Sequence, residues 1–174
     1  MKKWLYERLA FLTLILLKRI DRHYFSMVYA MLAHAGQKYD GHPYFLEHLL
    51  LVYREYDYDS KYASVAWLHD LLEDTKWPLP FWLTEREREA IQLLTRKPGV
   101  PYFQYVHKIS VSEDRLAFLV KEDDIRVNIS HSRRGTSRWR KYDKARRILW
   151  SGVLPDPKYL HRIEEDDYYE LDPI

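Results

Sequence analysis

Four side chains that can bind a metal ion or transfer protons lie within six residues: His69, Asp70, Glu73 and Asp74. The apolar residues that precede them predict a helix that runs through this stretch. In a helix, residues three or four positions apart share one face, so all four side chains would point the same way. An adjacent imidazole and carboxylate can bind one divalent cation, but a stable site needs further ligands from elsewhere in the chain.

The composition limits both the fold and the chemistry. Of the 174 residues, 47% are hydrophobic and 16% are aromatic, which is enough for one domain with a sizeable core. The absence of cysteine excludes disulfides, thiolate nucleophiles and cysteine-ligated zinc, and it fits a reducing, cytoplasmic location. The formal net charge of +2 argues neither for nor against an anionic partner.

The two ends of the chain are expected to differ from its middle. Residues 9–17 are mostly apolar, but they are far fewer than the roughly 20 residues that a membrane span needs, so no stable span is expected. We predict that residues 1–23 form an N-terminal helix packed on the domain, with a membrane-surface or processed segment as the alternative. Residues 151–174 include an acidic run at 164–167 and are predicted to form a surface tail.

The middle of the chain predicts an all-α fold of about seven or eight helices. Thr84 and Glu87 have the spacing of a capping box, which marks the start of a helix. A turn-rich loop is expected over 37–43. Apolar spacing and helix-breaking residues predict helices over 24–34, 46–56, 60–76, 84–94, 102–109, 113–129 and 137–150.

Several motifs follow one another in an order that resembles the HD-domain phosphohydrolases. They look most like the hydrolase domain of the RelA/SpoT alarmone family and its small stand-alone members. The matching motifs are Ala-His-x-Gly-Gln at 33–37, Gly-x-Pro-Tyr at 41–44 followed by His48, His-Asp-x-x-Glu-Asp-Thr at 69–75, and Lys-x-x-Asp-x-x-x-Asn at 121–128. Any one of them arises often by chance, whereas four in order are a strong signal. The resemblance covers about residues 24–150 and implies a single HD-domain helical bundle.

The same resemblance implies the ligands of a metal ion, namely His48, His69, Asp70 and Asp124. Two imidazoles and two carboxylates suit Mn²⁺, Fe²⁺ or Zn²⁺, and the family implies Mn²⁺. Such a set leaves room on a six-coordinate ion for water and a phosphate oxygen. The cation would lower the pKa of that water and polarise the phosphoryl group.

The resemblance also implies the reaction. Glu73 and Asp74 lie one turn beyond the predicted ligands, where they could deprotonate or orient water and protonate the leaving oxygen. In the family, the Glu-Asp pair marks the pyrophosphohydrolases. The expected activity is therefore removal of pyrophosphate from the 3′ position of (p)ppGpp, the alarmone of the stringent response, giving GDP or GTP.

Contacts to the nucleotide are indicated less directly. Lys38 and Tyr39 occupy the place of a basic pair that touches the base and phosphates in the family, although only Lys38 is basic. Asn128, one turn after Asp124, could bind a ribose or phosphate. The last predicted helix resembles one that faces phosphate in the family, and its basic residues are Arg138, Arg140, Lys141 and Lys144.

One departure from the family concerns the spacing before the first predicted ligand. Family members usually place this histidine four residues after the motif proline, whereas His48 follows Pro43 by five residues. The preceding loop, 37–43, is one residue shorter than usual.

Simpler interpretations stay open at this point. The carboxylates and histidines could form an ordinary polar helix face, and the basic residues of 133–147 could be a solvated surface. A nucleic-acid patch is not expected there, because few aromatic residues are interleaved. Two rival functions also remain: hydrolysis of another nucleotide, such as a dNTP, a nucleoside monophosphate or NADPH, and a non-catalytic nucleotide-sensing module. The sequence leaves a homo-oligomer open.

Overall fold

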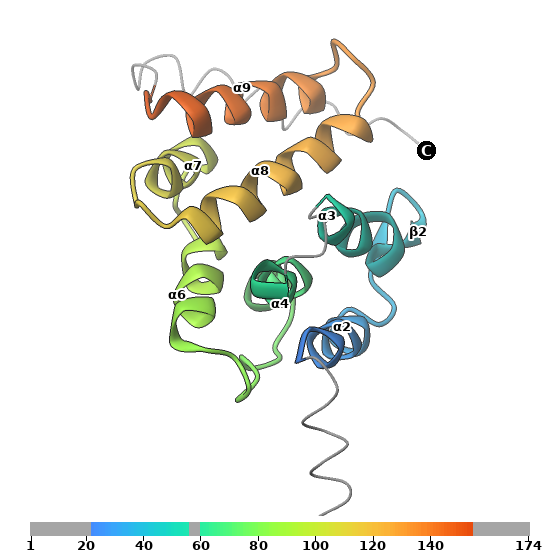
Figure 1. Cartoon of the computed structure of the whole chain (residues 1–174). Coiled ribbons are helices and arrows are strands. Elements are labelled where there is room, and N and C mark those ends of the chain that lie inside the picture. Colours follow the sequence, from blue (N-terminus) through green and yellow to red (C-terminus); the bar gives the residue numbers. More distant parts are fainter. Residues whose placement is uncertain (1–21, 56–59, 155–174) are drawn as a thin grey trace, which may run out of the picture.

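The computed structural model describes residues 22–55 and 60–154 (Figure 1). Within these ranges almost all regular structure is helical, which confirms the all-α prediction. The predicted N-terminal helix over 1–23 and the predicted tail over 151–174 fall almost entirely outside the described residues. Within the described residues, no helix combines the length and the apolar character that crossing a membrane would take.

The helices follow the predicted order, and most of their ends lie within two residues of the predicted ones. In chain order the elements are α2 (Arg22–Ala33), β1 (Lys38–Tyr39), β2 (His42–Pro43), the π-helix η1 (Phe45–Leu49), α3 (Leu50–Arg54), α4 (Ser60–Leu68), α5 (Leu71–Asp74), α6 (Glu85–Leu94), α7 (Tyr102–Ser110), α8 (Arg115–Ser130) and α9 (Ser137–Ser151).

Helix α4 is the centre of the bundle. Every residue from 63 to 69 is buried, and most of them are apolar, as expected of a helix inside a core. Helices α2, α3, α6 and α8 pack around it (Figure 1). Helix α8 continues past α4 and packs against α9, which also contacts α7. Helix α8 therefore connects the α4 core to the outer pair α7 and α9.

Side-chain caps set the starts of the long helices. The predicted capping box is confirmed: Glu87 N donates to Thr84 Oγ1 over 3.3 Å, and Thr84 N donates to Glu87 Oε2 over 2.7 Å. Asp114 caps α8 by accepting hydrogen bonds from the backbone of Leu116 and Ala117. Glu113 has a positive φ of 59° and so cannot belong to the helix, which explains why α8 begins two residues later than predicted.

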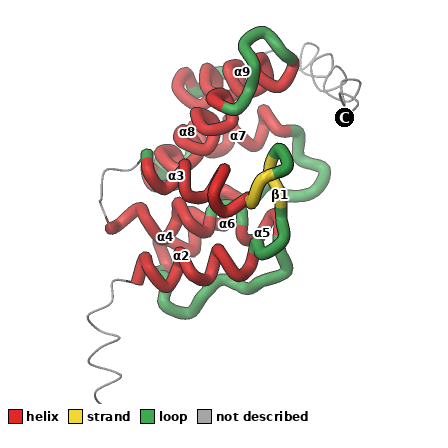
Figure 2. Tube along the Cα trace, turned by 90° about the vertical axis from the view of Figure 1, so that its right-hand side faces the viewer, coloured by secondary structure: helices red, strands yellow, loops and turns green. Residues whose placement is uncertain are grey.

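The predicted loop at 37–43 contains a very short β-hairpin (Figure 2). Lys38 pairs with Pro43, and Tyr39 pairs with His42. The two turn residues, Asp40 and Gly41, have φ values of 48° and 84°. Two-residue hairpins of this kind need positive φ at both turn positions, which Asp-Gly provides at low cost. The hairpin fixes the direction of Tyr39, which reaches the site described next.

Candidate metal centre and its pocket

The prediction of one continuous helix through 69–74 is wrong. Helix α4 ends at Leu68 and α5 begins at Leu71, and Asp70 between them has φ −98° and ψ 0°. Neighbouring side chains of a helix point about 100° apart. Because the helix is interrupted, His69 and Asp70 instead meet, and His69 Nε2 lies 2.8 Å from Asp70 Oδ2.

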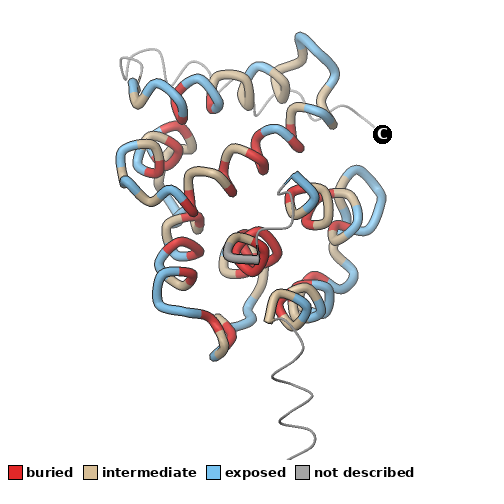
Figure 3. Tube along the Cα trace, in the orientation of Figure 1, coloured by how far each residue is buried: buried red, intermediate tan, exposed pale blue. Residues whose placement is uncertain are grey.

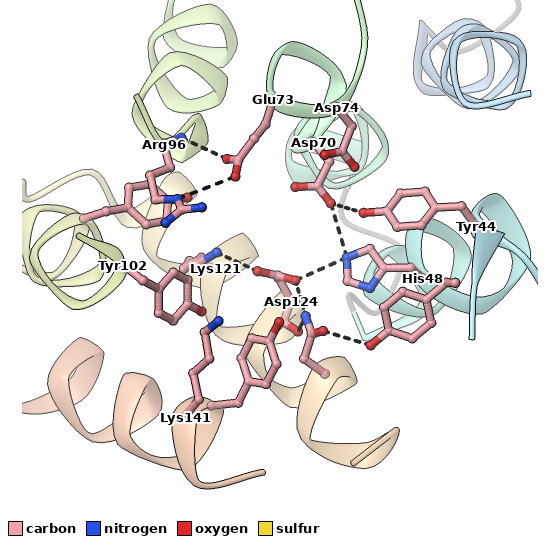
Figure 4. Close-up of a pocket in the computed structure, with 14 residues that line it drawn as sticks. Tyr44, His48, Asp70, Glu73, Asp74, Arg96, Tyr102, Lys121, Asp124 and Lys141 are labelled. Carbon is pink, nitrogen blue, oxygen red and sulfur yellow. Dashed lines mark hydrogen bonds and ion pairs between the residues drawn. The ribbon is translucent and has the colours of Figure 1, made fainter. Parts of the chain in front are cut away.

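The four predicted metal ligands converge from three parts of the chain. Donor atoms of His48, His69 and Asp124 all lie within 4.8 Å of one another, and this buried group could hold a metal ion. His48 Nε2 is 3.3 Å from His69 Nε2 and 3.2 Å from Asp124 Oδ1. Asp70 Oδ2 completes the cluster at 3.3 Å from His48 Nε2. Figure 4 shows His48 between the two carboxylates.

Outer contacts orient these donors as a divalent cation would require. Nδ1 of His69 lies 2.8 Å from the carbonyl oxygen of Ala66, so this nitrogen carries the proton and Nε2 faces the cluster. Asn128 Nδ2 donates to Asp124 Oδ1 over 2.7 Å. Hydrogen bonds that fix a ligand's tautomer and direction are typical of metal sites. The donor set and its supports therefore fit a cation held by nitrogen and oxygen.

The charges of the cluster balance one another in the absence of a cation. Burial lowers the pKa of His48, but its hydrogen bonds to Asp124 and Asp70 outweigh burial and raise the pKa to about 9. Burial also lowers the pKa of His69, but the charge and hydrogen bond of Asp70, together with the charge of Asp124, outweigh burial and raise it. Burial raises the pKa of Asp124, but the ammonium group of Lys121, 2.7 Å from Oδ2, and the hydrogen bond and charge of His48 together lower it. Protons on the imidazoles thus occupy the place that a cation would take.

The π-helix η1 explains how His48 reaches the cluster despite its altered spacing. The backbone N–H of Leu50 donates to the carbonyl oxygen of Phe45, five residues earlier, where an α-helix would bond residues four apart. A π turn takes up one additional residue, and such turns are frequent at functional sites. The extra residue between Pro43 and His48 is therefore absorbed within η1.

Tyr44 is part of the site, although the sequence indicates it only through the Gly-x-Pro-Tyr motif. Its hydroxyl donates to Asp70 Oδ2. Its ring packs against those of His34 and His48, with ring centroids 5.2 Å and 5.0 Å away. Burial, together with the charge of Asp70, raises the pKa of Tyr44, so its hydroxyl stays a donor. A tyrosine just before a ligand-bearing helix was the available signal.

The cluster opens into a pocket of about 220 Å³, and Glu73 and Asp74 line the same pocket (Figure 4). Glu73 Oε2 accepts a hydrogen bond from the backbone N–H of Arg96 over 2.9 Å. Burial raises the pKa of Glu73, and the contact with Arg96 offsets this only in part. Asp74 Oδ2 accepts a hydrogen bond from Gln37 Nε2 over 2.8 Å. Both carboxylates are thus held in place by partners outside α5.

Basic and aromatic side chains form the wall of the pocket away from α5. Lys121 Nζ lies 4.9 Å from the ring centroid of Tyr105, and Lys141 Nζ lies 5.1 Å from that of Tyr102. Arg96 Cζ lies 6.0 Å from the Tyr102 centroid. The hydroxyl of Tyr102 is buried and makes no hydrogen bond to any described residue. This wall offers positive charge and a hydrogen-bonding group, which are the features that bind phosphate.

Three of the residues predicted to contact the substrate line the pocket, namely Tyr39, Asn128 and Lys141. Tyr39 donates from its hydroxyl to Asn128 Oδ1 over 2.8 Å, and the guanidinium of Arg138 lies over the Tyr39 ring at 4.8 Å. Arg138 also forms an ion pair with Asp40 at 3.0 Å. Four other predicted contacts lie outside the lining, and their roles stay predictions: Lys38, Arg138, Arg140 and Lys144.

The sequence matches no protein-family profile, and none of the curated proteins compared with it is similar enough to count as a relative. The function of the pocket has to be inferred from its geometry and chemistry.

Proposed function

We propose that the protein is a metal-dependent phosphohydrolase of the HD-domain type, and that it removes pyrophosphate from the 3′ position of (p)ppGpp. One observation carries this proposal: the His/Asp cluster, the Glu73–Asp74 pair and a cationic wall all border one pocket. Each of the three parts has a separate use in hydrolysing a phosphate ester.

The cation would be held by the four clustered residues His48, His69, Asp70 and Asp124. Two imidazoles and two carboxylates suit Mn²⁺, Fe²⁺ and Zn²⁺ alike. We favour Mn²⁺ because the motifs resemble those of the alarmone hydrolases, with Fe²⁺ or Zn²⁺ as alternatives. When bound, the cation would polarise a phosphoryl oxygen and lower the pKa of a water molecule. Lys121 and Asn128 hold Asp124 in position for this role.

The two carboxylates of α5 would handle the protons. Burial raises the pKa of Glu73, which suits a group that protonates the leaving 3′ oxygen of the ribose. Asp74, held through Oδ2 by Gln37, would take the proton from the attacking water. In the balanced reaction, one phosphorus–oxygen bond forms to water, the bond to the 3′ oxygen breaks, and ppGpp with water yields GDP and pyrophosphate.

The size and charge of the pocket support a substrate that inserts its phosphate end. The volume of about 220 Å³ is below the roughly 300–1,000 Å³ common for whole ligands. Phosphates and ribose would enter beside Lys121 and Lys141, and the base would stay at the rim near Tyr39. This arrangement suits a nucleotide whose negatively charged phosphates lie next to the bond that is hydrolysed.

A second candidate is hydrolysis of a different nucleotide, such as a dNTP, a nucleoside monophosphate or NADPH. The observation that favours it is Tyr39, which stands where the alarmone hydrolases carry a basic residue. The Tyr39 hydroxyl is bonded to Asn128, and its ring lies against Arg138. A rim of this kind gives a base a different surface to stack on.

The test is product analysis with ppGpp, pppGpp, dNTPs, nucleoside monophosphates and NADPH, each with Mn²⁺ and with a chelator. We expect pyrophosphate release from the alarmones only, with loss of activity in chelator and in Asp124→Asn. The matched control is Asp123→Asn, one residue earlier on α8, where the carboxylate pairs with Arg126 at 3.5 Å instead. Cleavage of another nucleotide would support the phosphohydrolase activity but overturn the alarmone as its substrate. Nucleotide binding without hydrolysis would favour the non-catalytic nucleotide-sensing module instead.

A further inference from the structure

The outward side of α2 is apolar along its whole length. Every exposed residue of this helix is apolar, and their exposed fractions lie between 44% and 52%. Ser26 and Ala30, on the opposite side, are fully buried. Figure 3 shows that the buried part of α2 faces the rest of the bundle. The exposed residues are Tyr24, Val28, Met31 and Leu32, and Ala35 continues the row just beyond the helix.

This pattern is the reverse of what a solvent-facing helix shows. A helix at the surface of a bundle normally carries polar residues on its outer face. Contiguous exposed apolar surface usually marks a place where another segment or molecule binds. No part of the chain that the structure describes covers this face of α2.

The sequence just before α2 carries a matching row. Leu5, Leu9, Leu12 and Leu16 are separated by four, three and four residues, which places them on one face of a helix. Tyr24, Val28, Met31 and Ala35 have the same separations. The two rows are mirror images about position 20: residues 16 and 24 lie equally far from it, and so do 12 and 28, 9 and 31, and 5 and 35.

Such a mirror relationship is what two antiparallel helices joined by a short turn require. Residues 18–21 would form the turn, and helical hairpins use connections of about two to five residues. Residues 4–17 would span about 21 Å as a helix, and the 12 residues of α2 span about 18 Å. The spacing of four and three residues is also the repeat by which paired helices interlock their side chains.

We propose that residues 4–17 form a helix that folds back antiparallel onto the outward face of α2. In this arrangement Leu16 lies beside Tyr24, Leu12 beside Val28 and Leu9 beside Met31. The occupant is this segment of the same chain, because its leucine row has the register and length of the exposed row. The inference does not rest on the hydrolase proposal, since α2 contributes no residue to the lining of the pocket.

Engineered disulfides in the full chain test the register directly, because the protein has no cysteine of its own. The variant Leu12→Cys/Val28→Cys should form an intramolecular disulfide at least tenfold faster than Leu14→Cys/Val28→Cys, since position 14 lies on the other side of the same helix. Leu9→Cys/Met31→Cys should behave like the first pair, and it carries the test if the first variant does not fold. Circular dichroism checks folding, and non-reducing mass spectrometry separates linkages within one chain from those between chains.

The alternatives give different results. Disulfides formed mainly between chains would overturn the proposal and identify a second copy as the occupant. Equal rates for the matched and control pairs would also overturn it. A second measurement uses unlinked protein: Val28→Lys/Met31→Lys should speed hydrogen exchange of the amides at 9–16 at least tenfold. Unchanged exchange, or protection that appears only with phosphatidylglycerol vesicles, would contradict the intramolecular contact, the latter in favour of a lipid surface.

Discussion

The side-chain amide of Gln37 donates a hydrogen bond to Asp74 Oδ2 over 2.8 Å. On its other side, Gln37 Oε1 lies 2.7 Å from Nδ1 of His34, which is buried. The His34 ring in turn stacks on Tyr44, whose hydroxyl bonds to Asp70. One buried imidazole therefore supports both a proposed proton-transfer group and a proposed metal ligand.

Gln37→Ala should lower kcat by about 10–100-fold, as the loss of supporting contacts around metal sites often does, with little change in KM or metal content. The reason is that Asp74 loses the donor that fixes its direction. Steady-state kinetics and metal analysis of the purified variant measure the effect. Gln92→Ala, which truncates an exposed glutamine on α6, is the control. If Gln37→Ala raised KM and left kcat unchanged, Gln37 would be a substrate contact instead.

Metal affinity should rise steeply as the pH rises from about 6.5 to about 9. The pKa of His48 is raised to about 9 in the metal-free fold, so below that pH a cation must displace its proton. A group whose pKa is raised by folding contributes stability that is lost as the pH passes its folded pKa. The melting temperature without metal should therefore fall over this range, while the increase in melting temperature that Mn²⁺ produces should become larger. Thermal unfolding at several pH values measures both quantities. If Mn²⁺ raised the melting temperature equally at every pH, the cation would not be displacing the proton of His48.

Lys121→Met should destabilise the metal-free protein far more than the metal-bound one. Lys121 is buried and pairs with Asp124 at 2.7 Å, and removing one partner of a buried ion pair typically costs about 3–5 kcal/mol. A bound cation would compensate the charge of Asp124. Chemical denaturation with Mn²⁺ and with chelator gives the two costs, and Lys108→Met on α7, where the side chain is exposed, is the control. Equal costs in both conditions would argue against a cation beside Asp124.

Arg138→Ala should raise KM for the nucleotide several-fold and leave kcat nearly unchanged. Arg138 holds the hairpin against α9 through Tyr39 and Asp40, at the rim where the base is proposed to lie. Arg140→Ala is the matched control, because Arg140 lies about one half-turn further along α9 and is exposed. A larger effect of Arg140→Ala would restore that residue as the phosphate contact that the sequence indicated.

The helices were predictable because their signals are local. Apolar spacing and the Thr84–Glu87 box lie within a few residues of the elements they define. The interruption at Asp70 was not predictable in this way, because contacts with Tyr44 and His48, more than 20 residues away, accompany it. Helix propensity depends only on residues near in the sequence, so it predicts a helix that continues through Asp70.

The candidate site was predictable as a set of residues but not as a geometry. Motif order selected His48, His69, Asp70 and Asp124, and the structure brings their donor atoms together. The π turn that directs His48 left only an indirect sign in the sequence, the additional residue between Pro43 and His48. Likewise, which of the basic residues of α9 face the pocket depends on how that helix is rotated, and only packing against α7 and α8 decides the rotation.

The contact between Tyr39 and Arg138 joins residues separated by 99 positions. During synthesis, α2 and the hairpin leave the ribosome long before α9 has been made. The rim of the pocket cannot close until α9 has emerged and packed against α7 and α8. A nascent chain that has reached Asp124 would contain all four proposed metal ligands but still lack this rim. Under the proposed function, such a chain could bind a cation before it could select a nucleotide.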